Sequence, residues 1–375
     1  MAITRIANIA STIPDDSIAN VKMSNIVQSK NIIINGDQSI AQRSTSVSSI
    51  TTSGYYTVDR FNTFITTLGT WTQSQSTDVP TGQGFATSLK MDCTTADASP
   101  AAGDRLLIQQ RIEGHNLQYL KKGTSSAEST TVSFWVKSAK TGTYIVELYD
   151  NNNTRAISKS YTISSANTWE KKTLTYAGDT TGAFSNNSST SLILQFWLGA
   201  GTTYTSGTLS TSWSSVTNAN RAVGQVNLAD STSNEWYVTG VQLEAGDTAS
   251  DFEFLPVDFQ TQKCLRYYET SMTYGDLSQY AGQKVVYGNA GTSFGASSTT
   301  ADGRQYKVWK RAAPTITIYH QDGTSGAVYT IYNAAKITGV VAAHINQSGF
   351  LFISKTSSFA TGYGYYYGYT ANCEL

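Results

Sequence analysis

Short stretches that alternate apolar and polar residues follow one another along this chain from Asn31 almost to its end. In Thr131–Lys137 the alternation is clean, because Val132, Phe134 and Val136 fall on one side of an extended strand. Clusters of Gly, Asn, Asp and Ser separate the stretches. Many short strands with turn signals between them predict an all-β chain built as a sandwich or jelly roll.

The expected strands fall into two groups along the sequence. The first group comprises Ile32–Ile34, Tyr55–Phe64, Ala86–Met91, Leu106–Ile112, Thr131–Lys137, Tyr144–Tyr149, Ala156–Ile163, Glu170–Tyr176, Leu192–Leu198 and Glu235–Leu243. The second group comprises Gln283–Tyr287, Tyr306–Trp309, Thr315–Tyr319, Val328–Tyr332, Lys336–Val341, Phe350–Ile353 and Gly362–Thr370. We therefore expect a large jelly-roll β-sandwich followed by a smaller C-terminal β-sandwich.

Between the two groups the periodicity changes to that of a helix. Pro256 suits the first position of a helix. The positions that then share one helical face are Val257, Thr261, Cys264, Leu265 and Tyr268. We expect a short helix over residues 256–268, and we divide the chain into 1–30 (an extended N-terminal arm), 31–255 (the large sandwich), 256–274 (a helical linker) and 275–375 (the C-terminal sandwich).

The N-terminal 30 residues contain widely spaced isoleucines: Ile3, Ile6, Ile9 and Ile13. Their spacing is loosely helical and ends at Pro14. A segment of this length cannot bury a core of its own, so it is expected to order only against another protein, which makes these isoleucines candidate attachment residues. A leader without fixed structure is the alternative.

Charge and cysteine content exclude several classes of protein. Charged residues make up 14% of the chain, and 26 Lys and Arg balance 26 Asp and Glu, so the chain has no field to attract a nucleic acid. No apolar run is long enough to span a membrane, and the start lacks the apolar core of a signal peptide. Cys93, Cys264 and Cys373 are odd in number and far apart, which predicts reduced thiols and assembly in a cytoplasm.

Several motifs, in the right order, carry a resemblance to a known family. They are Asn31–Arg43, Gly54–Phe61, Ser133–Ser138, Trp236–Gly246, Cys264–Tyr268, Lys310–Thr315 and Tyr369–Leu375. Together these segments resemble a tail-fibre protein of bacteriophages and cyanophages over about residues 31–375. Trp236–Gly246 is also similar to the last strand of jelly-roll carbohydrate-binding modules. The resemblance implies a β-sandwich fibre component of the virion, a homotrimer, that contacts the host envelope.

No catalytic residue is predicted. Gly291–Gly295 matches G-x-S-x-G, but nothing helical follows Ser293, as a nucleophile elbow requires. The three histidines lack metal-ligand spacing, and Asp150–Thr154 lacks the glycine and late glutamate of an EF-hand. No cofactor and no metal-ligating residue is therefore expected, although the similarity to carbohydrate-binding modules leaves a structural calcium open.

Aromatic residues are the stronger candidates for ligand binding. Sugars present C–H groups on one ring face, which stack on Trp or Tyr, and hydroxyl groups at the edge, which bind amides, acids and hydroxyls. The candidates in polar, glycine-rich or serine-rich surroundings are Trp71, Tyr204, Trp213, Tyr363, Tyr365, Tyr366 and Tyr367. Alternation places Tyr363, Tyr365, Tyr367 and Tyr369 on one strand face and Tyr366 on the other. Packing against a core or a trimer interface is the alternative for each.

Three functions remain open at this stage. The first is a virion tail fibre that docks on other tail or baseplate proteins and binds a host cell-surface glycan. The second is a virion decoration or baseplate protein with no role in host binding. The third is a polysaccharide depolymerase, for which Asp59, Asp104 and Glu113 are the acids near strands. The first is favoured, without enzymatic activity, nucleic-acid partner or membrane insertion.

Overall fold

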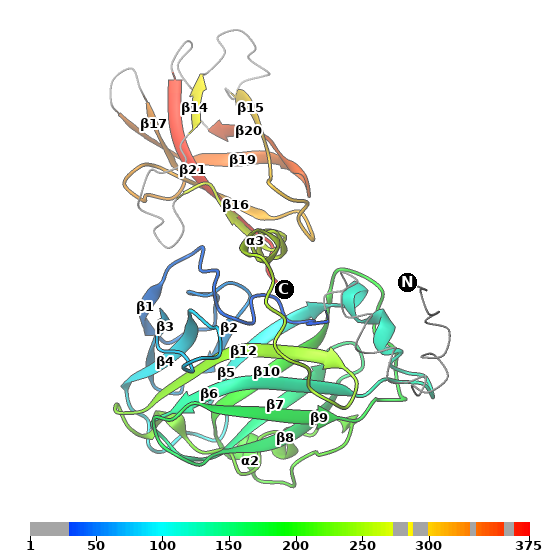
Figure 1. The fold of residues 1–375 in the computed structure, drawn as a ribbon. Helices are drawn as coiled ribbons and strands as arrows, with labels where there is room; N and C mark the ends of the chain where they lie inside the picture. The colour runs from blue at the N-terminus through cyan, green and yellow to red at the C-terminus, as the bar shows by residue number, and fades with distance from the viewer. Residues whose placement is uncertain (1–29, 273–283, 288–298, 331–334, 356–363) are drawn as a thin grey trace, which may run out of the picture.

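The computed structural model describes residues 30–272, 284–287, 299–330, 335–355 and 364–375. The predicted N-terminal arm, with Ile3, Ile6, Ile9 and Ile13, lies outside these residues, and so do Gly291–Gly295 and Tyr363. The described chain forms a large lower sandwich and a smaller upper one, with a short helix at the waist between them (Figure 1). The expected all-β fold with two sandwiches and one connecting helix is confirmed.

Two six-stranded antiparallel sheets form the large sandwich. The first has the order β1-β3-β4-β12-β6-β9, made of Ser46–Ile50, Thr70–Ser76, Ser88–Thr95, Glu235–Ala245, Thr130–Ser138 and Glu170–Tyr176. The second has the order β11-β8-β7-β10-β5-β2, made of Ser214–Ser215, Arg155–Ile163, Gly142–Asp150, Thr190–Ala200, Arg105–Glu113 and Asn62–Thr66. Short helical turns connect them: η3 (Gly114–Leu120), α2 (Thr202–Thr205), η4 (Asn218–Asn220) and η5 (Leu228–Asp230).

The chain passes repeatedly from one sheet to the other, which makes this sandwich a jelly roll. After β4 in the first sheet come β5 in the second, β6 in the first, β7 and β8 in the second, β9 in the first and β10 in the second. Each crossing puts one face of a strand against the opposite sheet. In β6, Val132, Phe134 and Val136 are fully buried in the core, whereas Trp135 on the other face is half-buried, as the alternation predicted.

The outer face of the second sheet is covered by the chain itself. Leu107, Ile145 and Trp197 point away from the main core and form a separate apolar cluster. Tyr204 of α2 and Ala222 complete this cluster from the segment between β10 and η5. That segment therefore closes the sheet face that would otherwise be open to a ligand.

The segment Asn31–Arg43 is a buried turn rather than a strand, so the strand expected at Ile32–Ile34 is wrong. Asn35 has a left-handed φ of 61°, and its side chain holds both the N–H and the C=O of Ile40 at 2.9 Å. A Cβ at Gly36 would meet the carbonyl oxygen of Val241 at 2.1 Å. Side-chain hydrogen bonds and close contact with β12 replace strand pairing here, which explains this motif structurally.

Helix α3 runs over Val257–Leu265, shorter than the expected 256–268. Pro256 is its N-cap, with an extended ψ of 141°, and the chain leaves the helix to enter β13 (Tyr268–Thr270). Cys264 and Leu265 are buried, but Val257 is 68% exposed, so the predicted helical face is only partly buried. The helix packs through its last turn, where it joins the C-terminal sandwich.

Two smaller sheets form the C-terminal sandwich. One is centred on β21 (Gly364–Asn372), which pairs with β13, β14 (Lys284–Tyr287), β16 (Thr315–Tyr319) and β17 (Ala327–Thr330), the last of which pairs with β18 (Lys336–Thr338). The other has the order β15-β20-β19, made of Thr299–Gln305, Gly349–Lys355 and Val340–Ile345. Tyr365, Tyr367 and Tyr369 of β21 all face the core between these sheets, which confirms the predicted alternation for these three residues.

Ion pairs join the two sandwiches at the waist. The last residues of the chain return to the large sandwich, where Glu374 binds Arg60 and lies 3.1 Å from Nη2 of Arg43. From the helix side, Arg266 makes two hydrogen bonds of 2.8 Å with the carboxylate of Glu113. Because both carboxylates are almost fully buried, these pairs fix the two sandwiches against each other.

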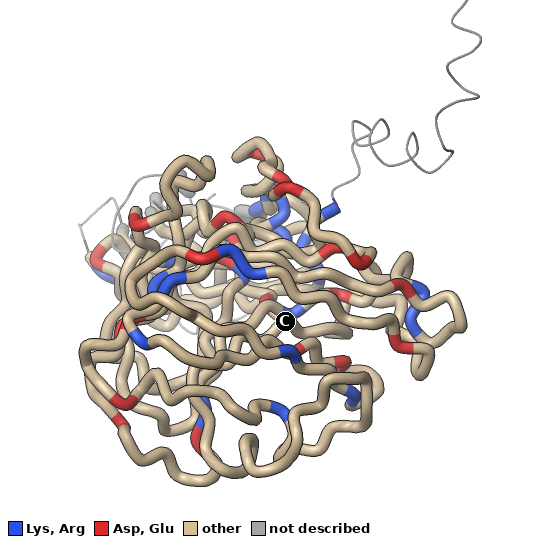
Figure 2. The backbone as a smooth tube through the Cα atoms, turned by 60° about the horizontal axis from the view of Figure 1, so that its bottom comes forward, with Lys and Arg blue, Asp and Glu red and all other residues tan. Residues whose placement is uncertain are grey.

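Elsewhere, basic and acidic residues are interspersed over the described chain (Figure 2). No described helix is long and apolar enough to cross a membrane. Cys93, Cys264 and Cys373 are unpaired and buried. Burial raises the pKa of Cys93 to about 11, so this thiol is protonated at neutral pH.

Candidate binding groove

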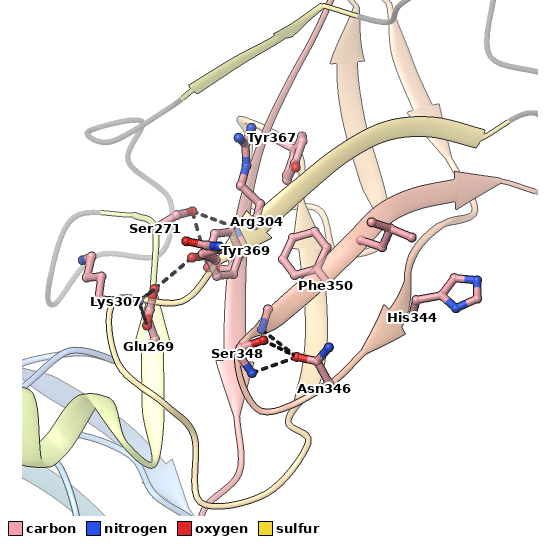
Figure 3. A pocket seen from close by; sticks show the side chains of 13 residues that line it. Glu269, Ser271, Arg304, Lys307, His344, Asn346, Ser348, Phe350, Tyr367 and Tyr369 are labelled. Atoms are coloured by element: carbon pink, nitrogen blue, oxygen red, sulfur yellow. Dashed lines mark hydrogen bonds between the residues drawn. The ribbon is translucent and has the colours of Figure 1, made fainter. Parts of the chain in front are cut away.

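A cavity lies at the edge of the C-terminal sandwich, where its two sheets separate (Figure 3). It is a groove of about 820 Å³. One wall comes from β13 and β21, and the other from β15, the end of β19 and β20. Five strands, from β13 near residue 270 to β21 near the end of the chain, therefore build this single site.

Aromatic rings form part of the groove lining. Phe350 of β20 and Tyr367 and Tyr369 of β21 line it, and all three belong to the C-terminal core. Phe350 packs edge-to-face against Tyr369 with ring centroids 5.4 Å apart, and the guanidinium of Arg304 lies 5.5 Å from the ring centre of Tyr367. Packing between the rings holds them in fixed orientations, and each ring is at most 7% exposed, so they form a rigid apolar wall with little surface of their own open to a ligand.

A buried carboxylate supports this aromatic part of the groove. Glu269 accepts hydrogen bonds from the hydroxyl of Tyr369 at 2.9 Å, from Nζ of Lys310 at 2.7 Å and from the backbone N–H of Lys307 at 3.0 Å. Burial raises the pKa of Tyr369, and the neighbouring Glu269 carboxylate raises it further. Burial also lowers the pKa of Lys310. Glu269 thus holds Tyr369, Lys310 and the backbone of Lys307 in place.

Most of the remaining lining is polar and more exposed, and Leu351, which is also exposed, is its apolar member. Gln305 and His344 are exposed, and Asn346 and Ser348 come from the turn between β19 and β20. Oδ1 of Asn346 accepts hydrogen bonds from the backbone N–H of Ser348 at 2.8 Å and of Gly349 at 3.0 Å. The turn is therefore held by its own side chain, and polar groups surround the aromatic part of the groove.

Trp309 stands on the loop beside this turn and is 70% exposed. Its loop is anchored on both sides, because Tyr306 donates its N–H to Ser348 O and Lys310 donates its N–H to Gln347 O, each at 2.9 Å. The strand expected at Tyr306–Trp309 is wrong, since β15 ends at Gln305. An exposed indole on an anchored loop next to the groove is a candidate stacking surface.

Two aromatics predicted to bind a ligand are buried instead. Trp71 is fully buried in β3, where its Nε1 donates to the carbonyl oxygen of Leu68 at 2.7 Å. Tyr204 is 7% exposed and packs against Trp197 with ring centroids 5.4 Å apart. Their polar sequence neighbours face outward while the rings face inward, so the ligand-binding interpretation is wrong for both.

Trp213 is half-buried in the large sandwich. Its Nε1 donates to the carbonyl oxygen of Ala177 at 2.8 Å, and Nζ of Lys122 lies 5.5 Å from its ring. The cavity beside it measures about 20 Å³, which is room for about one water molecule. This space is too small for a sugar ring, so the predicted ligand-binding role of Trp213 is corrected to packing.

The C-terminal tyrosines give a mixed result. Tyr365 is fully buried and lies away from the groove lining, which contradicts a direct binding role. Tyr367 is the one predicted site residue that the structure places in the groove, although only 4% of its surface is exposed. The side chain of Tyr366 and the whole of Tyr363 lie outside the described part of the chain.

The acids considered for hydrolysis do not share a cleft. Asp59 lies at the waist beside Arg43, and Asp104 accepts the N–H of Ala101 at 2.8 Å within its own turn. Glu113 is held by Arg266. Among the described residues, no group of three or more His, Cys, Asp or Glu side chains could hold a metal ion.

Sequence reasoning missed most of the groove. Trp309 had a weak signal, because Lys307 and Arg311 near it favour a surface position, although the adjacent Lys310 is fully buried. Arg304 and Phe350 had none, since each looks like an ordinary strand residue until the two sheets are packed. The pairing of β15 with β20, which sets Arg304 opposite Phe350, is what brings them together.

Comparison with known proteins gives a limited result. No protein-family model matches the chain, and no curated protein matches it in sequence. Among solved structures, it is similar to the enzymatically active domain of tailspike protein 4 of bacteriophage CBA120, at 17% identity and a TM-score of 0.29. The match covers 58% of this chain and 21% of that one, so it spans about a fifth of the tailspike.

Two sugar-binding domains are similar at the same level. The family 11 carbohydrate-binding module of Clostridium thermocellum is 9% identical, with 55% of this chain and 99% of that chain covered and a TM-score of 0.26. The N-terminal cellulose-binding domain of a β-1,4-glucanase from Cellulomonas fimi is 12% identical, with 44% and 83% covered and a TM-score of 0.25. The fold assignment rests on the strand pairing described above, which identifies a jelly-roll β-sandwich.

Proposed function

We propose that this chain is the receptor-binding component of a phage tail fibre and recognises a host surface polysaccharide in the groove of its C-terminal sandwich. The observation that carries the proposal is the groove itself. It combines aromatic rings with amide, hydroxyl and basic side chains, and the loop that carries the exposed Trp309 is hydrogen-bonded to the groove's turn between β19 and β20. The virion part of the proposal comes from the order of motifs between Asn31 and Leu375 that resembles tail-fibre proteins.

The chemistry of a sugar fits this combination. The C–H face of a pyranose ring would stack on the Trp309 indole. Its hydroxyl groups would bind the amide of Gln305, the imidazole of His344 and the hydroxyl of Ser348, which lie on the groove's walls. Few such contacts give weak binding, and a homotrimer repeated on each virion would raise it through avidity.

The single carboxylate in the described groove lining favours binding of a polysaccharide without its hydrolysis. Hydrolysis of a glycosidic bond uses two carboxyl groups placed about 5–10 Å apart across the substrate. Glu269 is the one carboxylate among the described lining residues, and three donors occupy it. A fixed and buried carboxylate of this kind holds Tyr369 and Lys310 in place.

The same proposal assigns residues 1–30 to docking on another tail or baseplate protein. Ile3, Ile6, Ile9 and Ile13 would provide the apolar contacts. Assembly in the host cytoplasm agrees with three reduced cysteines. Deleting residues 1–30 should abolish incorporation into virions and leave the circular dichroism spectrum of the purified chain unchanged. Incorporation of the deleted chain would overturn the docking assignment.

The binding part is tested with purified full-length chain and lipopolysaccharide extracted from the host. We expect the chain to bind this polysaccharide and to compete with phage adsorption. Trp309→Ala should weaken binding about tenfold, which corresponds to about 1.4 kcal/mol. Since Trp309 is 70% exposed, its replacement should leave thermal stability unchanged.

Tyr119→Ala is the matched control, because Tyr119 is 49% exposed on η3 of the large sandwich and far from the groove lining. This variant should bind as the wild type does. Equal binding by Trp309→Ala and wild type would remove Trp309 from the site. Failure of the wild type to bind or to compete would overturn polysaccharide recognition, and release of reducing ends would show hydrolysis instead.

A further inference from the structure

A second groove lies between the two sandwiches, at the waist of the molecule. Its volume is about 490 Å³, and none of its lining residues belongs to the groove described above. One wall is the outer face of the sheet formed by β13, β21 and β16. The other wall comes from the large sandwich, between Arg43 and Tyr56.

The sheet wall presents a ladder of small polar side chains. Thr315 and Thr317 alternate along β16 with Ile318, which is buried in the core. Directly opposite on β21 stand Asn372, paired with Thr315, and Thr370, paired with Thr317. Three hydroxyls and one amide, each able to donate and accept hydrogen bonds, thus lie along these two strands; Thr315 and Asn372 are exposed, Thr317 is half-buried and Thr370 is buried.

Tyrosine rings border this ladder. Tyr319 continues the outer row of β16 and is half-buried. Across the groove, Tyr56 is half-buried, and its hydroxyl donates to the carbonyl oxygen of Thr52 at 2.7 Å, which fixes the ring. The groove therefore offers aromatic surface from both sandwiches and hydrogen-bonding groups between them.

The groove carries no unbalanced charge in its described lining. Arg43 is the single ionic side chain there, and its guanidinium lies 3.6 Å from the ring centre of Tyr268. Glu374 at 3.1 Å and Asp59 at 3.6 Å balance it from behind. A nucleic acid or an acidic sugar would need positive charge to offset its own, so this lining favours a neutral ligand with many hydroxyl groups.

We propose that the groove between the two sandwiches is a second carbohydrate site, which takes a short neutral oligosaccharide. The sugar rings would stack on Tyr56 and Tyr319, and their hydroxyls would bind Thr315, Thr317 and Asn372. Because one wall comes from each sandwich, bound sugar would also hold the two sandwiches together. This site is independent of the groove in the C-terminal sandwich, and neither requires the other.

The test is calorimetric titration of the full-length chain with neutral hexasaccharides of glucose, galactose and mannose, with hexagalacturonate as the charged counterpart. We expect at least one neutral hexasaccharide to bind, and hexagalacturonate to bind at least tenfold more weakly. Tyr56→Ala and Tyr319→Ala should each weaken binding at least tenfold. Thr317→Val, which keeps the shape of this half-buried strand residue and removes its hydroxyl, should weaken it severalfold without changing the fold.

Trp309→Ala and Tyr119→Ala are the controls and should bind the neutral hexasaccharide as the wild type does. If Trp309→Ala loses this binding and the Tyr56 and Tyr319 variants keep it, the sugar occupies the other groove and the second site is overturned. Absence of binding by every neutral hexasaccharide, or tighter binding of hexagalacturonate, would overturn it as well. None of these results decides whether the C-terminal groove binds host lipopolysaccharide, which is tested by its own experiment.

Discussion

Each sandwich places aromatic rings beside a buried pair of a carboxylate and a cation. The two clusters differ in whether another segment of the chain covers them. In the large one, Trp197 and Tyr204 lie over a buried pair, Glu147 with Arg221, whose Nε and Nη2 donate at 2.8 and 2.9 Å. In the small one, Tyr369 lies beside the buried pair Glu269–Lys310, at 2.7 Å. The first arrangement is closed over by the segment that carries α2 and η4, whereas the second borders an open groove of about 820 Å³.

An aromatic cluster is therefore available to a ligand only where no other segment of the chain covers it, whatever its residue types. A carboxylate held by a cation under aromatic rings stabilises both regions. In the large sandwich the covering segment occupies the space above the sheet, and the cluster then serves packing alone. In the small sandwich the described residues leave that space open, so the same kind of cluster can support a binding site.

The largest expected loss of stability comes from removing Arg221 from its buried ion pair with Glu147 in the large sandwich. In Arg221→Ala, the Glu147 carboxylate stays fully buried and keeps the indole N–H of Trp197, at 3.2 Å, as a donor. A buried charge without its partner costs about 3–5 kcal/mol. The measurement is urea unfolding followed by circular dichroism, with the midpoint of the large sandwich's transition as the readout.

Lys310→Ala is the matched variant in the small sandwich. Here Glu269 keeps two donors, the Tyr369 hydroxyl at 2.9 Å and the Lys307 N–H at 3.0 Å, so we expect a smaller loss than in Arg221→Ala. Arg221→Ala should also leave binding of host polysaccharide intact, provided the small sandwich stays folded. An equal or larger loss in Lys310→Ala would contradict the difference drawn between the covered and the open cluster.

At the waist between the sandwiches we expect a pH-dependent change in folding stability, which is smaller than the loss in Arg221→Ala. Burial raises the pKa of Asp59 from its usual value to about 6, although the neighbouring Arg43 opposes this shift. The folded chain then binds a proton more readily than the unfolded chain, so the stability from Asp59 is complete below about pH 4 and is lost as the pH rises through about 6. The largest gain this shift allows is about 3 kcal/mol.

Thermal unfolding between about pH 7.5 and pH 5 measures this effect. We expect the melting temperature of the wild type to rise over that range relative to Asp59→Asn, which cannot titrate. Glu113, also at the waist, is buried, yet hydrogen bonds from Arg266 and Tyr267 lower its pKa, so its contribution is lost only at more acidic pH. Parallel curves for wild type and Asp59→Asn would show that Asp59 does not link pH to the docking of the sandwiches.

Much of the fold could be predicted from the sequence, because strand alternation is a local property. The alternation of Val132, Phe134 and Val136 correctly predicted which face of β6 is buried. It failed at Ile32–Ile34, where the side chain of Asn35 holds the backbone in a turn that a β-branched run does not reveal. Local side-chain hydrogen bonds overrode strand propensity there.

The candidate site could hardly be predicted, because it depends on which segments cover which faces. Trp71 and Tyr204 looked available from their polar neighbours, and only the packed sheets show that both rings point inward. Trp309 looked like a strand residue, and only the end of β15 at Gln305 places it on an exposed loop. Exposure of an aromatic residue is a property of the packed molecule.

The smallest expected effect concerns a third aromatic group, on the outer face of the first sheet. Trp169 packs edge-to-face on Tyr237 at 6.1 Å, and its Nε1 donates to Asp78 at 2.9 Å. Nζ of Lys137 lies 4.3 Å from the Tyr237 ring. Because Trp169 is half-buried, covers the buried Tyr237 ring and bonds to the exposed Asp78, Trp169→Ala should cost about 1 kcal/mol of stability, as measured by urea unfolding.

Polysaccharide binding by Trp169→Ala then tests whether this flat surface, rather than a groove, binds the receptor. The outer sheet face is uncovered, as the groove of the small sandwich is, but its aromatics and cations are bonded to one another across a flat surface. A flat surface buries less of a sugar than a groove does. We therefore expect Trp169→Ala to bind host lipopolysaccharide as the wild type does. A loss of about tenfold would place the receptor site on the large sandwich and reverse the comparison, because the open groove would then be the surface without a ligand.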